Sequence, residues 1–534
     1  MSFSKIASAF LLIILLVSCA PATQAPAVFP TYDPFLPETG STQALINIPS
    51  VTPSVTETIT PSPTATRPPT PTRVPLNISA LFGIKNQFTS NSPTPDVARV
   101  LPTPRQDADQ YVIQPGDTLG DIAQRYNVSL QTIMDTNSIT DPNSLEVGEV
   151  ILIPASQPSV SNSNALKIIP DSELVNGPAA AKFSLRNFIA SQNGYLNSYT
   201  QDVNGILLNG ADIIEAVAYN YSVNPRILLA LLEYQSGWVT NRTPANIDYP
   251  MGYADPVRAG LYRQVAWAAN TLNRGYYLWK ANALSTWVLA DGQVIPIDPT
   301  INAGTAAIQY FFSELDGYDA WIYDTSQTGV VVTYFVLFEN PFNFAVEPLI
   351  PPSLSQPPMQ LPFAEGESWY FTGGPHGAWD SGSAWGAMDF APPDNPGNCN
   401  ISTSWVTAAA DGLITRTGVG SVIQDLDNDG YEQTGWVILY MHVASAGRVT
   451  PGEYLFTNER VGHPSCEGGV SNATHVHIAR KYNGEWISAD GTYPFVLSGW
   501  VSSGDGIEYD GFLTRGAQTI EAWDGAQDIN LISR

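Results

Sequence analysis

The strongest constraint on this chain is a long stretch near its start that cannot build a core. Between residues 20 and 109, proline, threonine and serine dominate, as in the run Pro68-Pro69-Thr70-Pro71-Thr72. Such a sequence buries too little apolar area to offset the entropy lost on ordering. Dense proline keeps a backbone extended, so we predict a semi-rigid stalk over residues 19–109. Folded domains are expected in the rest of the 534 residues.

The residues before this stalk have the pattern of an export signal. A short apolar run follows Lys5 and ends in Leu16-Val17-Ser18-Cys19, and it is too short to span a membrane. It resembles the lipobox of bacterial lipoproteins, which implies a signal peptide over residues 1–18 and a lipid on Cys19. The chain would then be extracytoplasmic and lipid-anchored to the cell envelope. An ordinary cleaved signal is the alternative.

The net charge argues against some kinds of partner, and the number of cysteines bears on the redox compartment of the chain. The net charge of -26 and pI of about 4.3 argue against nucleic acid or an anionic membrane surface, because both attract basic proteins. Besides Cys19 the chain has only Cys399 and Cys466. In an exported protein such a pair predicts a disulfide, with two free thiols as the alternative.

Residues 110–155 alternate between strand and helix signals. A short strand, a Pro-Gly turn, two short helical repeats and a closing strand follow one another. The motifs Tyr111-Val112-Ile113-Gln114-Pro115-Gly116-Asp117-Thr118-Leu119 and Leu145-Glu146-Val147-Gly148 resemble a LysM module, a small βααβ unit. The resemblance implies that peptidoglycan binds through its glycan around Gly116, Asp117, Thr118 and the loop near Ile139. A purely structural spacer is the alternative.

Residues 165–346 carry long helical periodicities, at 213–221, 225–234 and 262–278. The run from Val223 to Gly237 resembles the catalytic helix of lysozyme-like lytic transglycosylases, which place a glutamate just before a Ser-Gly pair. This chain has Gln235 there, and an amide cannot donate the proton that glycan cleavage needs. Glu233, two residues earlier, points about 200° away on a helix. We therefore predict a degenerate glycan-binding domain rather than an active one.

A Pro-rich linker at 347–360 leads to a β-like region at 361–515, followed by a tail at 516–534. Four of the five histidines stand in motifs of this region: His376, His442, His475 and His477. His475 and His477 alternate in a strand-like run, so both imidazoles should project from one face. Catalytic zinc takes three protein ligands and leaves one position to water, which two histidines and Asp389 can supply.

These motifs resemble the lysostaphin-like zinc endopeptidases, in particular their staphylolysin or beta-lytic branch. Twelve residues separate His376 from Asp389, as in that branch, and the matching segments are Gly373-Gly374-Pro375-His376-Gly377, Ala387-Met388-Asp389-Phe390, Leu439-Tyr440-Met441-His442 and His475-Val476-His477. The resemblance implies a mostly antiparallel β domain in which His376, Asp389 and His477 bind one zinc ion and His442 and His475 are catalytic. Cys466 matches a cysteine of the branch, whereas the position of its partner is displaced, because Cys399 lies in the loop after Asp389.

Two further features of this region have open interpretations. Tyr440 lies two residues before His442 and could line the substrate cleft from the same strand face, or be a packed aromatic. Asp425, Asp427 and Asp429 resemble the start of a calcium loop, but the twelfth position is Trp436, so no acid closes it. A polar hairpin turn is the alternative there.

The sequence thus predicts a multidomain chain: a LysM module, a helical lysozyme-like middle domain and a C-terminal, mostly antiparallel β domain. We expect a zinc metalloendopeptidase that cuts peptide bonds in peptidoglycan cross-links or stem peptides and is targeted by the LysM module. A non-catalytic wall-binding or hydrolase-regulating lipoprotein is the alternative, and glycine-rich protein substrates are a third possibility. The bond that is cut depends on loop shapes that sequence does not define.

Overall fold

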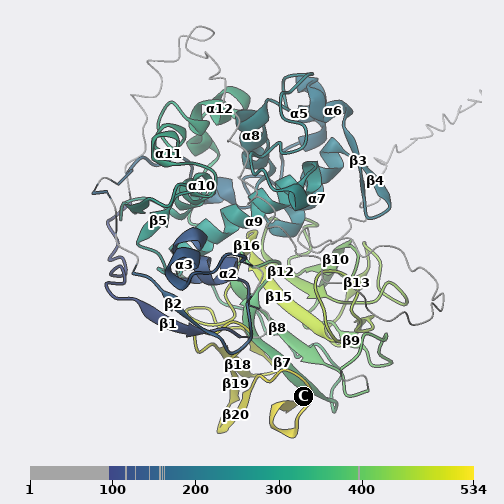
Figure 1. Cartoon of the computed structure of the whole chain (residues 1–534). Helices are drawn as coiled ribbons and strands as arrows, with labels where there is room; N and C mark the ends of the chain where they lie inside the picture. The colour runs from purple at the N-terminus through teal and green to yellow at the C-terminus, as the bar shows by residue number, and fades with distance from the viewer. Residues whose placement is uncertain are drawn as a thin grey trace, which may run out of the picture.

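The structure is a computed structural model that describes residues 96–534, except 115–116, 127, 143–144, 156–157, 159, 162 and 395–396. The predicted signal peptide, the lipidation site at Cys19, the stalk up to residue 95 and Gly116 lie outside the described residues. No helix among the described residues combines the length and apolarity needed to cross a bilayer. Figure 1 shows three folded parts: a small module, a helical part and a β-rich part at the C-terminal end.

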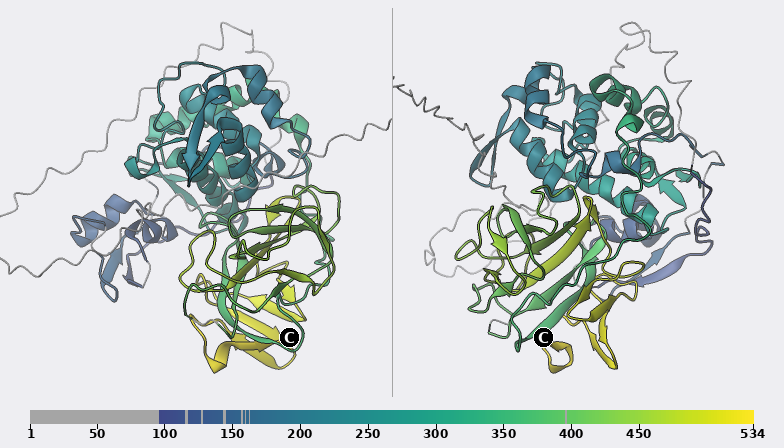
Figure 2. Two further views of the ribbon diagram at one scale, coloured as in Figure 1. Left: turned by 90° about the vertical axis from the view of Figure 1, so that its right-hand side faces the viewer. Right: turned by 180° about the vertical axis from the view of Figure 1, so that it is seen from behind.

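The small module has the predicted βααβ order. Its elements are β1 (Asp109–Val112), α2 (Leu119–Arg125), α3 (Leu130–Asn137) and β2 (Val150–Ile153), with β1 antiparallel to β2. Its separate apolar core contains Ile113, Leu119, Ile122, Ile133, Ile151 and Ile153. In the left view of Figure 2 the module stands to one side of the other two parts.

The last residues of the predicted stalk are packed against the helical part. The backbone N–H groups of Asp96 and Arg99 donate to the carbonyls of Thr300 and Pro299, at 2.8 and 3.0 Å. The guanidinium of Arg99 lies over the ring of Trp279, 4.7 Å from its centroid. The stalk prediction was therefore wrong at the C-terminal end of the stalk. There a cationic side chain is attracted to an aromatic ring that is distant in the sequence.

The helical part forms around three helices at the predicted positions: α7 (Gly210–Tyr221), α8 (Pro225–Ser236) and α9 (Leu261–Lys280). Local signals set their ends: Asn209 and Asp212 form a capping box on α7, and Gly237 ends α8 with a φ of 70°. The other elements are α4 (Asp171–Leu174), α5 (Leu185–Gln192), α6 (Tyr195–Ser198), β3 (Thr200–Val203), β4 (Ile206–Asn209), η2 (Pro256–Arg258), β5 (Thr286–Val288), β6 (Val294–Pro296), α10 (Ala303–Ser313), α11 (Tyr318–Asp324), α12 (Val330–Phe338) and η3 (Pro341–Phe344).

The C-terminal part is antiparallel, as predicted. Its main sheet runs in the order β13-β10-β11-β12-β15-β8-β7-β21, with β16 paired to β15. The strands are β7 (Ser368–Gly377), β8 (Trp385–Ala391), β9 (Val406–Thr407), β10 (Gly412–Thr417), β11 (Val422–Asp425), β12 (Trp436–Met441), β13 (Tyr454–Leu455), β14 (Arg460–Gly462), β15 (Val476–Tyr482), β16 (Glu485–Trp486), β17 (Val496–Leu497), β18 (Trp500–Ser503), β19 (Phe512–Arg515), β20 (Gln518–Glu521) and β21 (Leu531–Ser533).

Residues 516–534 are part of this fold rather than a tail. β20 pairs with β19, and β21 pairs with β7 along Leu531↔Tyr370 to Ser533↔Ser368. Both strands have only three or four residues. Such short runs show too few alternations for a period of two to stand out in the sequence.

The two faces of the main sheet have different roles. Because side chains alternate along a strand, Met388, Ile438 and Ile478 pack into the main β core, while Ala387, Leu439 and Ala479 lie on the other face with Asp389 and His477. The helical part packs against that second face beside β16, where α9 lies next to the sheet in Figure 1. Tyr276 donates to Glu485 at 3.1 Å, and the Tyr277 hydroxyl accepts from the backbone N–H of Trp486 at 2.9 Å.

Candidate metal centre and active site

Three neighbouring strands bring the predicted zinc ligands together. His477 in β15 is directly paired with Asp389 in β8, and β7 carries His376 beside them. The β7–β8 register shifts around His376, which turns that side chain toward the others. Gly373 faces Asp389 across this pair, and a Cβ there would lie 2.8 Å from Asp389 Oδ2. A glycine is therefore required for the carboxylate to occupy its place.

The facing atoms of these three residues form a nearly regular triangle. His376 Nε2 lies 3.0 Å from His477 Nδ1, and each nitrogen lies 3.3 Å from Asp389 Oδ1. Ligand atoms 2.0–2.1 Å from a tetrahedral zinc ion are about 3.3–3.4 Å apart, so the triangle has the dimensions of one face of such a site. All three residues are buried.

The hydrogen bonds behind these atoms indicate that a cation belongs between them. His376 Nδ1 lies 2.8 Å from the Gly374 carbonyl and His477 Nε2 lies 3.0 Å from that of Ala378, so these nitrogens carry the protons. The nitrogens that face each other then present lone pairs. Asp389 Oδ1 is buried and has no hydrogen-bond donor among the described residues. Three converging lone pairs fit a zinc ion and repel one another without a cation.

The electrostatics of the site favour an ionised Asp389 and neutral imidazoles at His477 and His442. Burial opposes ionisation of Asp389, yet its electrostatic attraction to His376 and His475 holds its pKa well below the usual range. Burial lowers the pKa of His376, but the Asp389 carboxylate outweighs this effect and raises it. Burial also lowers the pKa of His477, and it lowers that of His442 far more strongly, with help from His475 and His477. Neutral imidazole is the form that binds metal or accepts a proton.

His442 and His475 lie next to this triangle with their rings 4.4 Å apart. His475 Nε2 is 3.7 Å from Asp389 Oδ2. The Nδ1 atoms face the carbonyls of Glu467 at 3.2 Å and Ala473 at 2.8 Å, which leaves both Nε2 atoms available for proton transfer. His442 follows the end of β12 with a φ of 62°, a strained conformation for a non-glycine residue that turns its ring toward the site.

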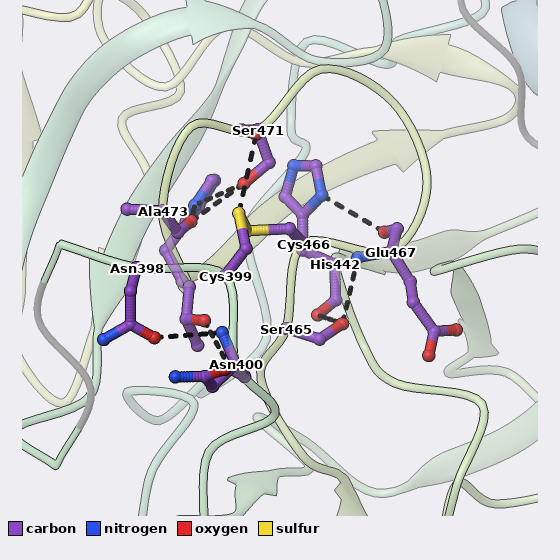
Figure 3. Close-up of a disulfide and its surroundings, with 11 residues drawn as sticks. Asn398, Cys399, Asn400, His442, Ser465, Cys466, Glu467, Ser471 and Ala473 are labelled. Atoms are coloured by element: carbon purple, nitrogen blue, oxygen red, sulfur yellow. Dashed lines mark hydrogen bonds between the residues drawn. A yellow bond between two sulfur atoms is a disulfide. The ribbon is translucent and has the colours of Figure 1, made fainter. Parts of the chain in front are cut away.

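A disulfide joins the two segments that hold these histidines (Figure 3). Cys466 stands between Ser465, whose hydroxyl donates to the His442 carbonyl at 2.9 Å, and Glu467, whose carbonyl faces the His442 ring. Cys399 follows Asn398, whose carbonyl accepts from Thr474 beside His475 at 2.7 Å. The bond therefore fixes both catalytic candidates relative to each other.

Comparisons with known proteins identify relatives of the helical part and of the small module. A family model described as the LasA N-terminal domain matches residues 167–352, and a LysM domain model matches residues 111–154. Protease LasA of Pseudomonas aeruginosa is 25% identical over 305 residues, which cover 53% of this chain and 69% of that protein. The chain is therefore similar to protease LasA, and it carries a LysM domain.

Other similarities are more local. The N-acetylmuramoyl-L-alanine amidase XlyB of Bacillus subtilis is 40% identical over 63 residues, 12% of this chain and 20% of that protein. The solved structure of pseudoalterin, described as an M23 metalloprotease from the deep sea, is 24% identical. It covers 33% of this chain and 98% of its own, with a TM-score of 0.27.

Without its disulfide, we expect the active site of this LasA-like chain to lose its geometry but to keep its metal ion. The bond closes a loop between residues 67 apart, and losing such a constraint costs about 4 kcal/mol of stability. We expect Cys466→Ser to lower kcat/KM about tenfold while zinc content stays at one ion per chain. Kinetics and metal analysis, with Cys399→Ser as the matched variant, would check this. Unchanged kcat/KM in both variants would contradict a positioning role.

Tyr509 is a residue of the site that sequence reasoning missed. Its ring stacks on His376, with centroids 4.3 Å apart and planes 19° apart. Its backbone N–H donates to the Pro375 carbonyl at 3.2 Å, and its carbonyl accepts from Gly374 N–H at 2.7 Å. It lies in a loop outside every recognised motif, so neither periodicity nor spacing could have indicated it.

Tyr509 should therefore matter for metal affinity through its ring. We expect Tyr509→Ala to weaken zinc binding about tenfold, because changes to groups that orient a metal ligand typically cost 10- to 100-fold. Tyr509→Phe keeps the stacked ring and should bind zinc as the wild type does. Competition with a zinc-binding dye measures both constants. Equal weakening in the two variants would assign the effect to the hydroxyl instead.

Tyr440 does not line the site, which corrects the cleft interpretation. Its side chain is fully buried, and its hydroxyl donates to Gln424 at 2.8 Å and accepts from Ala409 N–H at 2.8 Å. The alternation argument failed because β12 ends at Met441 and the positive φ of His442 breaks the period. Tyr440 is a packed aromatic of the β core.

The remaining candidates also have defined surroundings. The Asp117 carboxylate accepts from the Tyr111 hydroxyl at 2.8 Å and from Gln114 N–H at 2.7 Å, so it holds its turn, and Thr118 precedes α2. Glu233 is buried and accepts from the backbone N–H groups of Val239 and Thr240, at 2.9 and 3.0 Å. Those bonds give Glu233 a structural role.

Asp425, Asp427 and Asp429 come close enough to share one ion. Asp425 is buried, and its oxygens accept from the backbone N–H groups of Asp427 and Gly430, at 3.1 and 2.9 Å. Burial and the hydrogen bond with Asp427 raise the pKa of Asp425 to about 7. These contacts are those of a polar turn, and calcium binding stays a prediction.

Proposed function

We propose that this LasA-like chain hydrolyses peptide bonds in the cross-links or stem peptides of peptidoglycan, with His376, Asp389 and His477 as zinc ligands. The observation that carries the proposal is the triangle of lone pairs with sides of 3.0 and 3.3 Å, in which the buried Asp389 Oδ1 has no hydrogen-bond donor among the described residues. A non-catalytic relative has no need for such a costly arrangement of buried polar groups.

The chain's own residues define how the reaction would proceed. Bound zinc supplies a Lewis acid for the scissile carbonyl and a water molecule of lowered pKa. His442, kept neutral by burial, accepts a proton through Nε2 while its Nδ1 stays bonded to the Glu467 carbonyl. His475 lies beside Asp389 and, when protonated at Nε2, donates a hydrogen bond to the oxyanion or its proton to the leaving amine. In the second case the proton that His442 took from the water replaces the one that His475 has given up.

The other parts of the chain have roles in targeting and anchoring in this proposal. The LysM module binds glycan and raises the local concentration of peptide bonds. A lipid on Cys19 and the stalk hold the enzyme outside the cytoplasm at the cell envelope. The helical part, which matches the LasA N-terminal domain, acts as a degenerate lysozyme-like glycan-binding domain, and calcium at Asp425 would brace the nearby turn.

Mass spectrometry of purified peptidoglycan treated with the chain tests the function directly. We expect new free amino groups in the peptide fragments and intact glycan strands. Glycan fragments that carry intact peptides would instead support an active helical domain. No new fragment, together with firm wall binding, would support the non-catalytic alternative.

The LysM module should affect insoluble substrate only. Removing residues 110–155 is expected to slow digestion of whole cell walls at least about tenfold, because tethering raises effective concentration. Hydrolysis of a soluble muropeptide should stay unchanged, since the module contributes no residue to the metal site. Parallel assays on the two substrates measure the ratio. An equal loss on both would mean that the module supports the fold instead.

A further inference from the structure

A pocket of about 970 Å³ opens on the β-rich part, away from the metal site. It lies between the linker at residues 355–360, the loops around Asn458 and Tyr493, and the side chains of Arg480, Arg515 and Arg534. Arg480 and His477 are three residues apart in β15, so they project from opposite faces of the sheet. The pocket is therefore behind the sheet, on the side of the main β core.

Arg480 is a buried cation without a carboxylate. It is 0% exposed, and its hydrogen bonds go to the carbonyls of Ser488 and Tyr493 and to the side-chain oxygen of Gln356. Its Nε has no acceptor among the described residues. The rings of Phe495 and Trp436 lie 4.6 and 5.5 Å away and add attraction but no negative charge. Burial lowers the pKa of Arg480 to about 9.

Other buried cations of this chain, unlike Arg480, are paired with carboxylates. Arg416 and Lys481 share Glu432 at 2.7 and 3.2 Å. Arg226 meets Glu173 at 3.1 Å. Isolating a charge in a protein interior is costly, so proteins pair buried charges. An unpaired guanidinium therefore indicates a ligand that supplies the missing charge.

The rest of the pocket adds to the positive potential. Arg515 and Arg534 are half-buried on its walls and donate to backbone carbonyls, such as that of Ser498 at 3.3 Å. No ion pair joins Arg480, Arg515 or Arg534 to a carboxylate in the part of the chain that the structure describes. Glu365 is the one acidic residue among the described residues that line the pocket. A positive pocket stands out in a chain of net charge -26.

We propose that this arginine pocket, defined by Arg480, Arg515 and Arg534, binds a small ligand through a carboxylate or phosphate group. Guanidinium groups match the planar or tetrahedral oxygens of both anions. The volume is that of a small-molecule site. The site is independent of the hydrolase function, because it lies on the other face of the sheet.

Calorimetric titration of the full chain tests the site with defined probes. The probes are sodium phosphate and acetyl-alanyl-alanine, which separate a phosphate source from a carboxylate source, and the C-terminal amide of the same dipeptide serves as the neutral control. The titrations are repeated in His477→Ala, because zinc itself binds anions. We expect one anionic probe to bind in both proteins and the amide to bind at least about tenfold more weakly.

Variants assign the binding to the pocket. Arg515→Gln and Arg534→Gln should each weaken the bound probe about tenfold, while Arg460→Gln, an exposed arginine that stacks on Trp405, should leave it unchanged. Arg480→Met is interpreted only if its thermal transition matches that of the wild type. No binding by either anion at millimolar concentration, equal binding of the amide, or unchanged binding in both Gln variants would overturn the proposal.

Discussion

Replacing His477 with alanine is expected to lower kcat/KM at least about a thousandfold and to remove bound zinc from the purified chain. The change deletes one corner of the triangle that His376 Nε2, Asp389 Oδ1 and His477 Nδ1 form at 3.0 and 3.3 Å. Two protein ligands hold zinc far less tightly than three, and without the ion the carbonyl and the attacking water lose their activation. Metal analysis and steady-state kinetics on one preparation measure both effects.

The chain provides its own matched control. His463 is the one histidine outside the site, with its ring on Trp405 and its Nδ1 facing the Ser404 carbonyl at 2.8 Å. We expect His463→Ala to keep one zinc ion and nearly full activity. If His477→Ala retained stoichiometric zinc and wild-type kcat/KM, the proposed ligand set would be wrong.

The second large effect is expected at His442 and His475, with zinc retained. Neither residue belongs to the triangle, so alanine there should leave metal content at one ion per chain. General acid–base groups contribute about 10²- to 10⁴-fold, and we expect each single variant to lower kcat within that range. The double variant should be less severe than the product of the single effects, because the two imidazoles serve one proton transfer.

The metal content distinguishes this result from a structural one. A His442→Ala variant that loses zinc together with activity would show that His442 supports the ligands rather than the reaction. His442→Gln offers a further check, because glutamine keeps a hydrogen-bonding side chain but cannot exchange a proton at neutral pH. Recovery of activity in that variant would remove the proposed role of His442 as a base.

Sequence reasoning worked where a function depends on local pattern. The alternation of His475 and His477 predicted one shared face, and the structure places both beside Asp389. Helix positions were predictable for α7, α8 and α9 because each has a long apolar period and end signals such as Asn209 and Gly237. The pairing of Cys399 with Cys466 followed from an exported chain with two spare cysteines.

Sequence reasoning failed where one residue breaks a pattern or where partners are distant. Tyr440 and His442 do not share a face, because the positive φ of His442 breaks the alternation of the strand. A period of two in the sequence does not show such a break. Tyr509 reaches His376 across more than 130 residues, from a loop with no motif. The strands β20 and β21 are too short to show alternation, and only pairing with β19 and β7 stabilises them.

By itself the sequence determined the order of the three parts, the helices with long periods and the identity of the residues that can hold zinc. These depend on composition and on spacing along one strand or one helix. The tertiary structure alone decided which atoms of those residues face each other, that Tyr509 stacks on a ligand, that the helical part covers the metal-side face of the sheet, and that Arg480 lies buried behind it. Such contacts join different strands, helices and loops, and their energies depend on how the whole core packs rather than on any local preference.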